Sequence, residues 1–366
     1  MMSERRRILF LAPLPPPVHG SAVVSDCIRR SPVIGGRFDC DFVNLSTSRA
    51  NSEVGGKGIR KFGRFLSAYF KTLARLVAHR YDLCYIALTC YGKGFLKDAP
   101  FALLCKTFGR RLVIHQHNKG MASYADKPLF RTLYKWVYSG SRVILLSWNL
   151  YPDIESVVSR GQVSVCPNGI EDVPLPAKTA GDVPEILFMS NLMESKGPLV
   201  LLDACMNLKS NGIAFHCTLA GDETLEISRC RMLSEIESRG LSGEVRYAGP
   251  CYGSEKEALL SSAGIFVHPS SNDCFPLVIL EAMRSGIPVV STREGGIPDM
   301  VRDGVDGILC GCASADELAA AARRLCSDAG LREKMGRAGR ESFESRFELG
   351  AFEHRLADIL EECANG

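Results

Sequence analysis

Short apolar runs alternate along the chain with stretches in which apolar residues recur at the spacing of an α-helix. The runs are rich in Val, Ile and Leu and end in turn residues, which is typical of strands buried on both faces of a parallel sheet. We expect strands at residues 7–11, 39–44, 81–88, 111–115, 142–146, 162–165, 185–189, 214–220, 245–248, 264–267, 288–291 and 307–310.

Helices are predicted between these strands by the helical periodicity. They are expected at residues 21–30, 59–79, 99–108, 128–138, 149–158, 198–210, 224–239, 255–261, 277–285 and 315–327, followed by a helical tail. This order predicts an α/β fold of two doubly wound parallel sheets. The proline-rich stretch 173–179 indicates a linker between a first domain, 1–175, and a second, 176–349. Ligands of such folds bind at the carboxyl ends of the strands, here in a cleft between two facing domains.

Composition and charge narrow the class of protein. The chain has 366 residues, 46% hydrophobic and 23% charged, which excludes a disordered or fibrous protein. No apolar run reaches the roughly 18 residues of a membrane span, and the stretch 8–11 is too short for a signal peptide. Residues 1–177 carry 25 basic and 12 acidic side chains, a net +13, and the rest carries a net −10. Two such halves indicate two bodies with different partners.

The cysteines indicate the compartment. All fifteen are scattered, their number is odd, and no Cys-x-x-Cys pair occurs. The tight pair of Cys310 and Cys312 has no further Cys or His nearby to complete a metal site. We therefore expect reduced thiols in a cytoplasmic protein.

The stretch 267–283 holds the densest group of candidate site residues. A strand is expected to end near His268, a polar loop follows, and Pro276 stands where a helix would begin. The first turn of that helix, at Leu277 and Val278, would present free backbone N–H groups and the positive end of the helix dipole. Such a helix start suits a diphosphate.

Two acids flank this helix start. Asp273 precedes it and Glu281 lies eight positions later on the helix, so one carboxylate can face a sugar and the other ribose hydroxyls. By themselves, the two acids equally fit a helix-capping Asp and a surface Glu. The segment resembles the Glu-x7-Glu signature of the retaining glycosyltransferases of family 4, which have the GT-B fold, and residues 282–299 continue the match. The resemblance covers nearly the whole chain and is most specific over 186–309. It implies that Asp273, in place of the usual Glu, sits by the donor sugar and that Glu281 binds the ribose.

The segment 187–197 resembles the strand and loop in which that family holds the donor diphosphate between an Arg and a Lys five residues later. Lys196 matches the Lys, but Asn191 stands where Arg is usual and Ser190 where Gly is usual. Lys196 supplies a point charge without the bidentate fork of Arg. Either Asn191 donates a neutral hydrogen bond or another cation substitutes. Lys196 also fits a solvated lysine before a helix.

Loops of the first half extend the resemblance. Gly20, at an expected helix start, matches the loop that lies over the donor phosphates, although a plain tight turn also fits. His117 matches the family's histidine beside the donor sugar, whereas His115 is expected to be a core or supporting residue. Asn168 belongs to a Pro-Asn-Gly loop at the domain boundary and is assigned no chemistry. The helical end, 350–366, resembles the GT-B terminal helix that crosses back to the first domain.

Together these matches predict the site. The expected catalytic residues are Lys196, Asp273 and His117, and the expected nucleotide-sugar-binding residues are Gly20, Asn191, Lys196, Phe275, Pro276, Leu277, Val278 and Glu281. The resemblance implies a retaining transfer from a UDP- or GDP-linked sugar to a glycan or polyprenyl-linked glycan, with no metal or other cofactor and no nucleic acid. The second domain would hold the donor and the first domain the acceptor.

Two alternative functions stay open. One is a GT-B nucleotide-sugar epimerase, for which no acid/base carboxylate set is found. The other is a non-catalytic nucleotide-sugar-binding subunit, favoured only by Asn191 and Asp273.

Two motifs suggest other chemistry and are rejected. Asp39 and Asp41 have the Asp-x-Asp spacing of metal-dependent transferases, but they begin a strand in the first half, so we interpret them as a strand edge. The glycine-rich run 55–58 lacks the spacing and the Ser or Thr of a phosphate-binding P-loop.

The stretch 57–80 combines apolar and basic residues without a single acid. An apolar stripe is formed by Ile59, Phe62, Leu66, Tyr69, Leu73 and Leu76, and a separate basic face by Arg60, Arg64, Lys71 and Arg75. The pattern fits a core-packed helix with a solvated basic face. It equally suits peripheral docking at the inner face of the cell membrane on anionic lipid, where a lipid-linked acceptor would be found.

Overall fold

The computed structural model describes residues 5–16, 19–48, 59–174, 176, 181, 183–311 and 314–365. Several expected features lie outside these residues: most of the linker, the glycine run 55–58, Lys57 and Cys312. None of the 14 cysteines within them forms a disulfide bond with another described cysteine. No helix in the described part of the chain is long and apolar enough to cross a membrane.

The chain forms two compact units, Met1–Asn168 with Gly350–Gly366, and Gly169–Leu349. The boundary therefore lies before Gly169 and not at the expected 175/176. Residues after Asn168 pack within the second unit: the Ile170 N–H donates to the Phe347 carbonyl at 3.1 Å, and Asp172 pairs with Arg340 at 2.5 Å.

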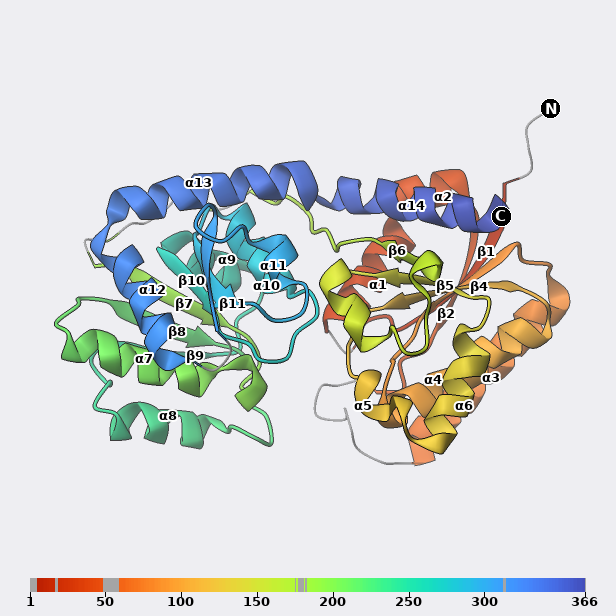
Figure 1. Ribbon diagram of the computed structural model, residues 1–366, viewed down its shortest axis with the longest axis horizontal. Coiled ribbons are helices and arrows are strands. Elements are labelled where there is room, and N and C mark those ends of the chain that lie inside the picture. Colours follow the sequence, from red (N-terminus) through yellow and green to blue (C-terminus); the bar gives the residue numbers. More distant parts are fainter. Residues whose placement is uncertain are drawn as a thin grey trace. The chain divides into compact units, whose positions relative to one another are not determined.

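The first unit is built on a six-stranded sheet in the order β2-β1-β3-β4-β5-β6, with all neighbours parallel. Its strands are β1 (Arg7–Ala12), β2 (Asp39–Asn44), β3 (Leu83–Ala87), β4 (Arg111–Gln116), β5 (Arg142–Leu145) and β6 (Val163–Val165). Its helices are α1 (Gly20–Arg30), α2 (Pro32–Arg37), α3 (Ile59–Ala78), α4 (Gly92–Thr107), α5 (Ala122–Ala125), α6 (Pro128–Tyr138) and α14 (Leu349–Asn365). Helix α1 lies on one face of this sheet, and α3, α4 and α6 lie together on the other, as Figure 1 shows.

The second unit repeats the architecture. Its sheet has the order β12-β11-β10-β7-β8-β9, again parallel throughout. Its strands are β7 (Glu185–Met189), β8 (His216–Ala220), β9 (Val245–Gly249), β10 (Ile265–His268), β11 (Val289–Thr292) and β12 (Gly307–Cys310). Its helices are α7 (Pro198–Ser210), α8 (Arg229–Ser238), α9 (Gly253–Ser262), α10 (Leu277–Arg284), α11 (Ile297–Met300), α12 (Ala315–Ser327) and α13 (Ala329–Arg346). The predicted fold class, two doubly wound parallel sheets, is confirmed.

Three helix predictions need correction. The expected helix 149–158 is a 3-10 helix at Trp148–Asp153, where Pro152 removes a backbone donor. The helix expected to begin at residue 99 begins at Gly92, and Pro100 lies inside it. The helix expected from residue 224 begins at Arg229, capped by the Ser228 side chain.

Helix α3 does not bury its expected apolar stripe along its full length. Leu76 is buried, whereas Ile59 and Phe62 are 92% and 62% exposed. The face that packs on the unit includes Ala68 and Thr72, so it is rotated away from the predicted stripe. An apolar stripe with exposed large side chains is left on the surface.

Candidate functional site

The loop between β10 and α10 carries the predicted sugar-side carboxylate. Asp273 is held by the side chains of Lys196 and His268: Lys196 Nζ donates to Oδ2 at 2.6 Å, and His268 Nε2 lies 3.0 Å from the same oxygen. Lys196 also donates to the Asn272 carbonyl at 2.9 Å. The structure thus joins Lys196 and Asp273, which were predicted separately, into one ion pair.

This environment keeps the carboxyl group of Asp273 ionised. Burial raises its pKa, but the hydrogen bond and charge of His268, together with Lys196, outweigh burial and lower the pKa to about 2. At neutral pH the loop therefore presents a fixed negative charge whose orientation is set by Lys196 and His268.

The position of Lys196 depends on close backbone contact between two loops. Gly197 adopts a left-handed φ of +79°, and a Cβ at this position would lie 2.3 Å from the Pro269 carbonyl oxygen. The Ser271 N–H donates to the Ser195 carbonyl at 2.8 Å and ties the loops together. Asn191, in the same loop, is exposed after the end of β7.

A second glycine brings another loop against Asp273. Gly295 has a φ of +52°, and a Cβ there would lie 2.0 Å from the Asp273 carbonyl oxygen. Next to it, Glu294 Oε1 accepts a hydrogen bond from the Asp273 N–H at 3.3 Å. The loop after β11 therefore fixes the backbone of Asp273, while Lys196 and His268 fix its side chain.

Helix α10 begins as predicted, directly after Pro276. No side chain in the described part of the protein caps its first turn, which contains Leu277 and Val278. The side chain of Phe275 is buried, with its ring 6.0 Å from that of Phe347. Phe275 therefore anchors the helix start, and any ligand contact it makes must come from its backbone.

Glu281 lies on α10 and is mostly buried, its side chain being 15% exposed. Its Oε1 accepts from Lys256 Nζ at 2.7 Å, whereas Oε2 is buried with no hydrogen-bond partner in the described residues. An unsatisfied buried carboxylate oxygen is costly, so this atom is suited to accept a hydrogen bond from a ligand hydroxyl.

Three of these partners, His268, Lys256 and Glu294, were not predicted from the sequence. His268 ends a buried strand beside the candidate loop, and this position is the signal that could have identified it. Lys256 and Glu294 lie 25 and 21 residues from their partners, and no spacing rule reveals either contact.

In the first unit, Gly20 begins α1 and the adjacent His19 caps it, with Nδ1 3.4 Å from the Ala22 N–H. His117 follows β4, and its Nε2 is buried without a partner in the described residues. Burial, together with the nearby charge of His19, lowers the pKa of His117 to about 4, so its imidazole is neutral at pH 7. His115 is fully buried and meets the Tyr85 hydroxyl at 2.7 Å, which confirms its prediction as a core residue.

Asp39 and Asp41, rejected above as a metal-binding motif, lie next to basic side chains. Asp39 begins the edge strand β2 and lies 3.3 Å from Arg7, whereas Asp41 pairs with Arg7 and Arg75 and accepts from the Tyr81 hydroxyl at 2.8 Å. Across the described ranges, no group of three or more His, Cys, Asp and Glu side chains is placed to hold a metal ion.

Comparison with known proteins shows which family the second unit resembles and which solved structure shares the fold. Residues 173–342, almost the whole second unit, match the family described as "Glycosyl transferases group 1". The whole chain superposes on the structure of HepE from Anabaena in complex with UDP and glucose, with a TM-score of 0.74 over 98% of this chain and 100% of the other, at 20% identity. The architecture is therefore the GT-B fold of two Rossmann-like domains.

The sequence relatives are glycosyltransferases by name. The chain is 29% identical over 182 residues to the lipopolysaccharide core biosynthesis glycosyltransferase LpsE of Rhizobium meliloti, covering 50% of this chain and 51% of LpsE. It is 32% identical over 198 residues to the putative colanic acid biosynthesis glycosyltransferase WcaL of Escherichia coli, covering 51% and 47%. The chain spans about half the length of the curated relatives it matches.

Proposed function

We propose that the protein is a retaining glycosyltransferase of the family 4 type, which transfers a sugar from a nucleotide sugar to a glycan or lipid-linked glycan. The observation that carries the proposal is the cluster at the carboxyl ends of β7 and β10. It combines the Lys196–Asp273 pair, the uncapped start of α10 and the unpartnered oxygen of Glu281. A diphosphate, a sugar and a ribose each find a chemically suited group there.

Each residue has a distinct role in this proposal. Lys196 and the first N–H groups of α10 would stabilise the departing nucleotide diphosphate. Asp273 would accept hydrogen bonds from donor-sugar hydroxyls, and Oε2 of Glu281 from a ribose hydroxyl. His117, whose imidazole is neutral at pH 7, would contact the donor sugar. No general base is assigned, and an oxygen of the leaving phosphate would take the acceptor proton on the same face of the sugar.

The UDP and glucose named for the HepE structure favour a UDP-sugar donor, with a GDP-sugar as the other possibility. The relatives LpsE and WcaL favour an acceptor in bacterial polysaccharide assembly. Because charge on the diphosphate would be balanced by Lys196 and α10, the reaction would need no metal.

The function is tested by ligand binding and turnover in one series. Among a panel of UDP- and GDP-sugars, the true donor should raise the melting temperature of the protein. A ligand at 100 times its Kd stabilises the native state by ~2.7 kcal/mol. Release of the nucleotide should then depend on added lipid-linked oligosaccharide and should persist in EDTA. The glycosylated product should keep the anomeric configuration of the donor sugar. Binding without acceptor-dependent release would instead favour the non-catalytic subunit, and isomerisation of the donor would favour the epimerase. Loss of activity in EDTA with rescue by Mg²⁺ would contradict the metal-independent reaction.

We also propose that the first unit docks peripherally on the cytoplasmic face of the membrane. Ile59, Phe62, Phe70 and Val77 are 61–92% exposed on α3. At ~100° per residue they lie within about 80° of one another, as a single stripe suited to the lipid interface. Exposed apolar side chains gathered on one helix commonly mark such a contact.

Flotation tests this docking. With vesicles containing phosphatidylglycerol, we expect the native protein to float and the double variant Phe62→Ser/Phe70→Ser to stay mostly at the bottom of the gradient. Leu233→Ser, which changes an exposed leucine of α8 in the second unit, should float like the native protein. Equal flotation of the double variant, or none by the native protein, would rule the docking out.

A further inference from the structure

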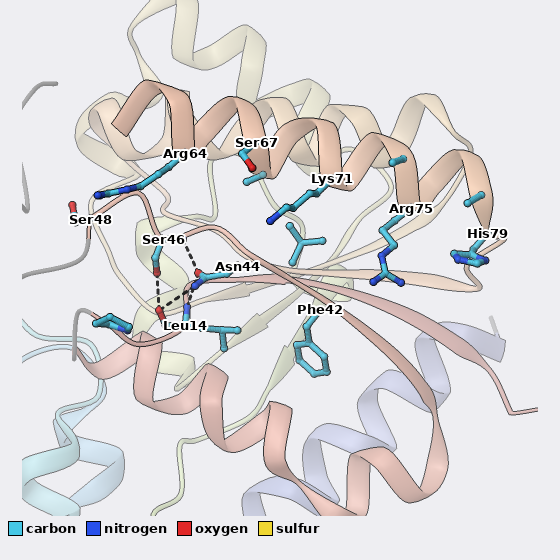
Figure 2. A pocket seen from close by; sticks show the side chains of 15 residues that line it. Leu14, Phe42, Asn44, Ser46, Ser48, Arg64, Ser67, Lys71, Arg75 and His79 are labelled. Carbon is cyan, nitrogen blue, oxygen red and sulfur yellow. Dashed lines mark hydrogen bonds between the residues drawn. The ribbon is translucent and has the colours of Figure 1, made fainter. Parts of the chain in front are cut away.

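A groove of about 1110 Å³ runs along α3 in the first unit, next to the ends of β1 and β2. Figure 2 shows Arg64, Lys71 and Arg75 extending from α3 over the groove, with Asn44 and Ser46 on its opposite wall. Three of the four residues of the predicted basic face, all except Arg60, therefore line this groove. At ~100° per residue, this face points away from the exposed apolar stripe on the same helix.

The groove carries excess positive charge. None of its 15 lining residues is acidic. Arg75 is ion-paired with Asp41, and Arg64 donates to the Thr47 carbonyl at 2.8 Å. Lys71 is exposed and has no hydrogen-bond or ion-pair partner among the described residues. An ammonium group in a basic groove without a counter-charge favours an anionic ligand.

The wall opposite α3 is fixed by hydrogen bonds. Asn44 Oδ1 accepts from the N–H groups of Leu14 and Ser46, at 3.0 and 2.8 Å, and Ser46 Oγ donates to the Leu14 carbonyl at 2.9 Å. Phe42 continues this wall, its ring stacked 4.7 Å from that of Phe10. The groove thus offers a preorganised polar end next to an apolar surface.

We infer that this groove binds the diphosphate group of a prenyl-linked acceptor. A phosphoryl group suits the unpaired point charge of Lys71 and the guanidinium of Arg64, with the hydroxyls of Ser48 and Ser67 within the same lining. The first carbons of the prenyl chain would lie on Phe42 and on the alanines of α3. The inference rests on the proposed function, because it names the class of acceptor, but the groove belongs wholly to the first unit and its binding can be measured without turnover.

Calorimetric titration with farnesyl diphosphate tests the inference, with excess UDP and GDP present to occupy any nucleotide site. We expect the native protein to bind farnesyl diphosphate, and Lys71→Gln to weaken binding at least about tenfold. Lys71→Arg should retain most of the affinity, and Lys135→Gln, which neutralises an exposed lysine of α6 outside the groove, should retain all of it. Affinity should fall as salt is raised.

Two further ligands identify what the groove recognises. Farnesol, which lacks the diphosphate, should not bind, and inorganic diphosphate should bind more weakly than farnesyl diphosphate. Equal binding of inorganic and farnesyl diphosphate would overturn the prenyl part of the inference, and equal affinity of Lys71→Gln and native protein would overturn the site itself. The melting-temperature rise with the donor sugar should be unchanged in Lys71→Gln. If farnesyl diphosphate does not bind but the donor sugar still raises the melting temperature, this inference fails and the proposed function stands. The opposite pair of results would contradict the proposed function and leave the groove.

Discussion

Replacing Lys196 by alanine is expected to lower the rate of sugar transfer at least about tenfold, equivalent to ~1.4 kcal/mol of transition-state stabilisation. Two losses combine in this variant. The departing diphosphate loses its cation, and Asp273 loses the partner that holds its Oδ2 at 2.6 Å. Because Asn191 carries no charge, the loop 190–197 offers no second cation. Steady-state assays at saturating donor measure the effect.

Two variants show whether the loss is specific. Lys209→Ala removes a lysine of α7 that also makes an ion pair, with Glu244 at 2.9 Å, and its transfer rate should stay close to native. Lys196→Arg keeps the charge and should recover part of the rate. The melting temperature of Lys196→Ala is expected to fall modestly, because the partly buried carboxylate of Asp273 loses one of its two partners and keeps only His268. A near-native rate in Lys196→Ala would refute its assignment to the donor diphosphate.

Glu281→Gln is expected to raise the KM for the donor at least about tenfold, because an amide cannot offer the ribose the charged acceptor that Oε2 provides. The substitution preserves side-chain volume but weakens the contact with Lys256, which lies 2.7 Å from Oε1. A partly buried ammonium without its carboxylate costs stability, so a fall in melting temperature accompanies the kinetic effect.

The double variant Glu281→Gln/Lys256→Gln separates these two effects. With both charges removed, the melting temperature should recover toward the native value, while the donor KM stays high. If the KM recovered together with the melting temperature, Glu281 would act only through the packing of α9 against α10, and its contact with ribose would be excluded.

The strands could be predicted because each is a short apolar run, and parallel strands covered on both faces require such runs. Helix starts were harder to place. Gly92 and Gly94 lie in the first turn of α4 and Pro100 lies further along it, and all three are residues that normally interrupt helices. Tertiary packing overrides these local signals: Phe95 and Phe101, on either side of Pro100 in the sequence, are both buried.

The site residues were predicted in part, but their partnerships were not. Lys196 and Asp273 are 77 residues apart, and their contact depends on β7 and β10 being neighbours in the sheet. The same limit applies to α3. Its basic face follows from helical periodicity alone, whereas the groove exists only because the end of β2 packs beside that face. Periodicity defines the faces of a helix, and the topology decides what each face meets.

Helix α14 makes the first unit discontinuous in the chain. Its buried residues include Phe352, Leu356 and Leu360. Arg111 on β4 donates to the carbonyl of Ala364 at 2.6 Å, and Arg37 at the end of α2 pairs with Asp358 at 2.5 Å. During synthesis, the first unit therefore cannot complete its core until the entire second unit has been translated. Until then, the surface that α14 covers stays exposed. A gene fragment ending near Asn168 would encode an incomplete hydrophobic core, whereas one that fuses residues 350–365 behind Asn168 through a short linker would restore it.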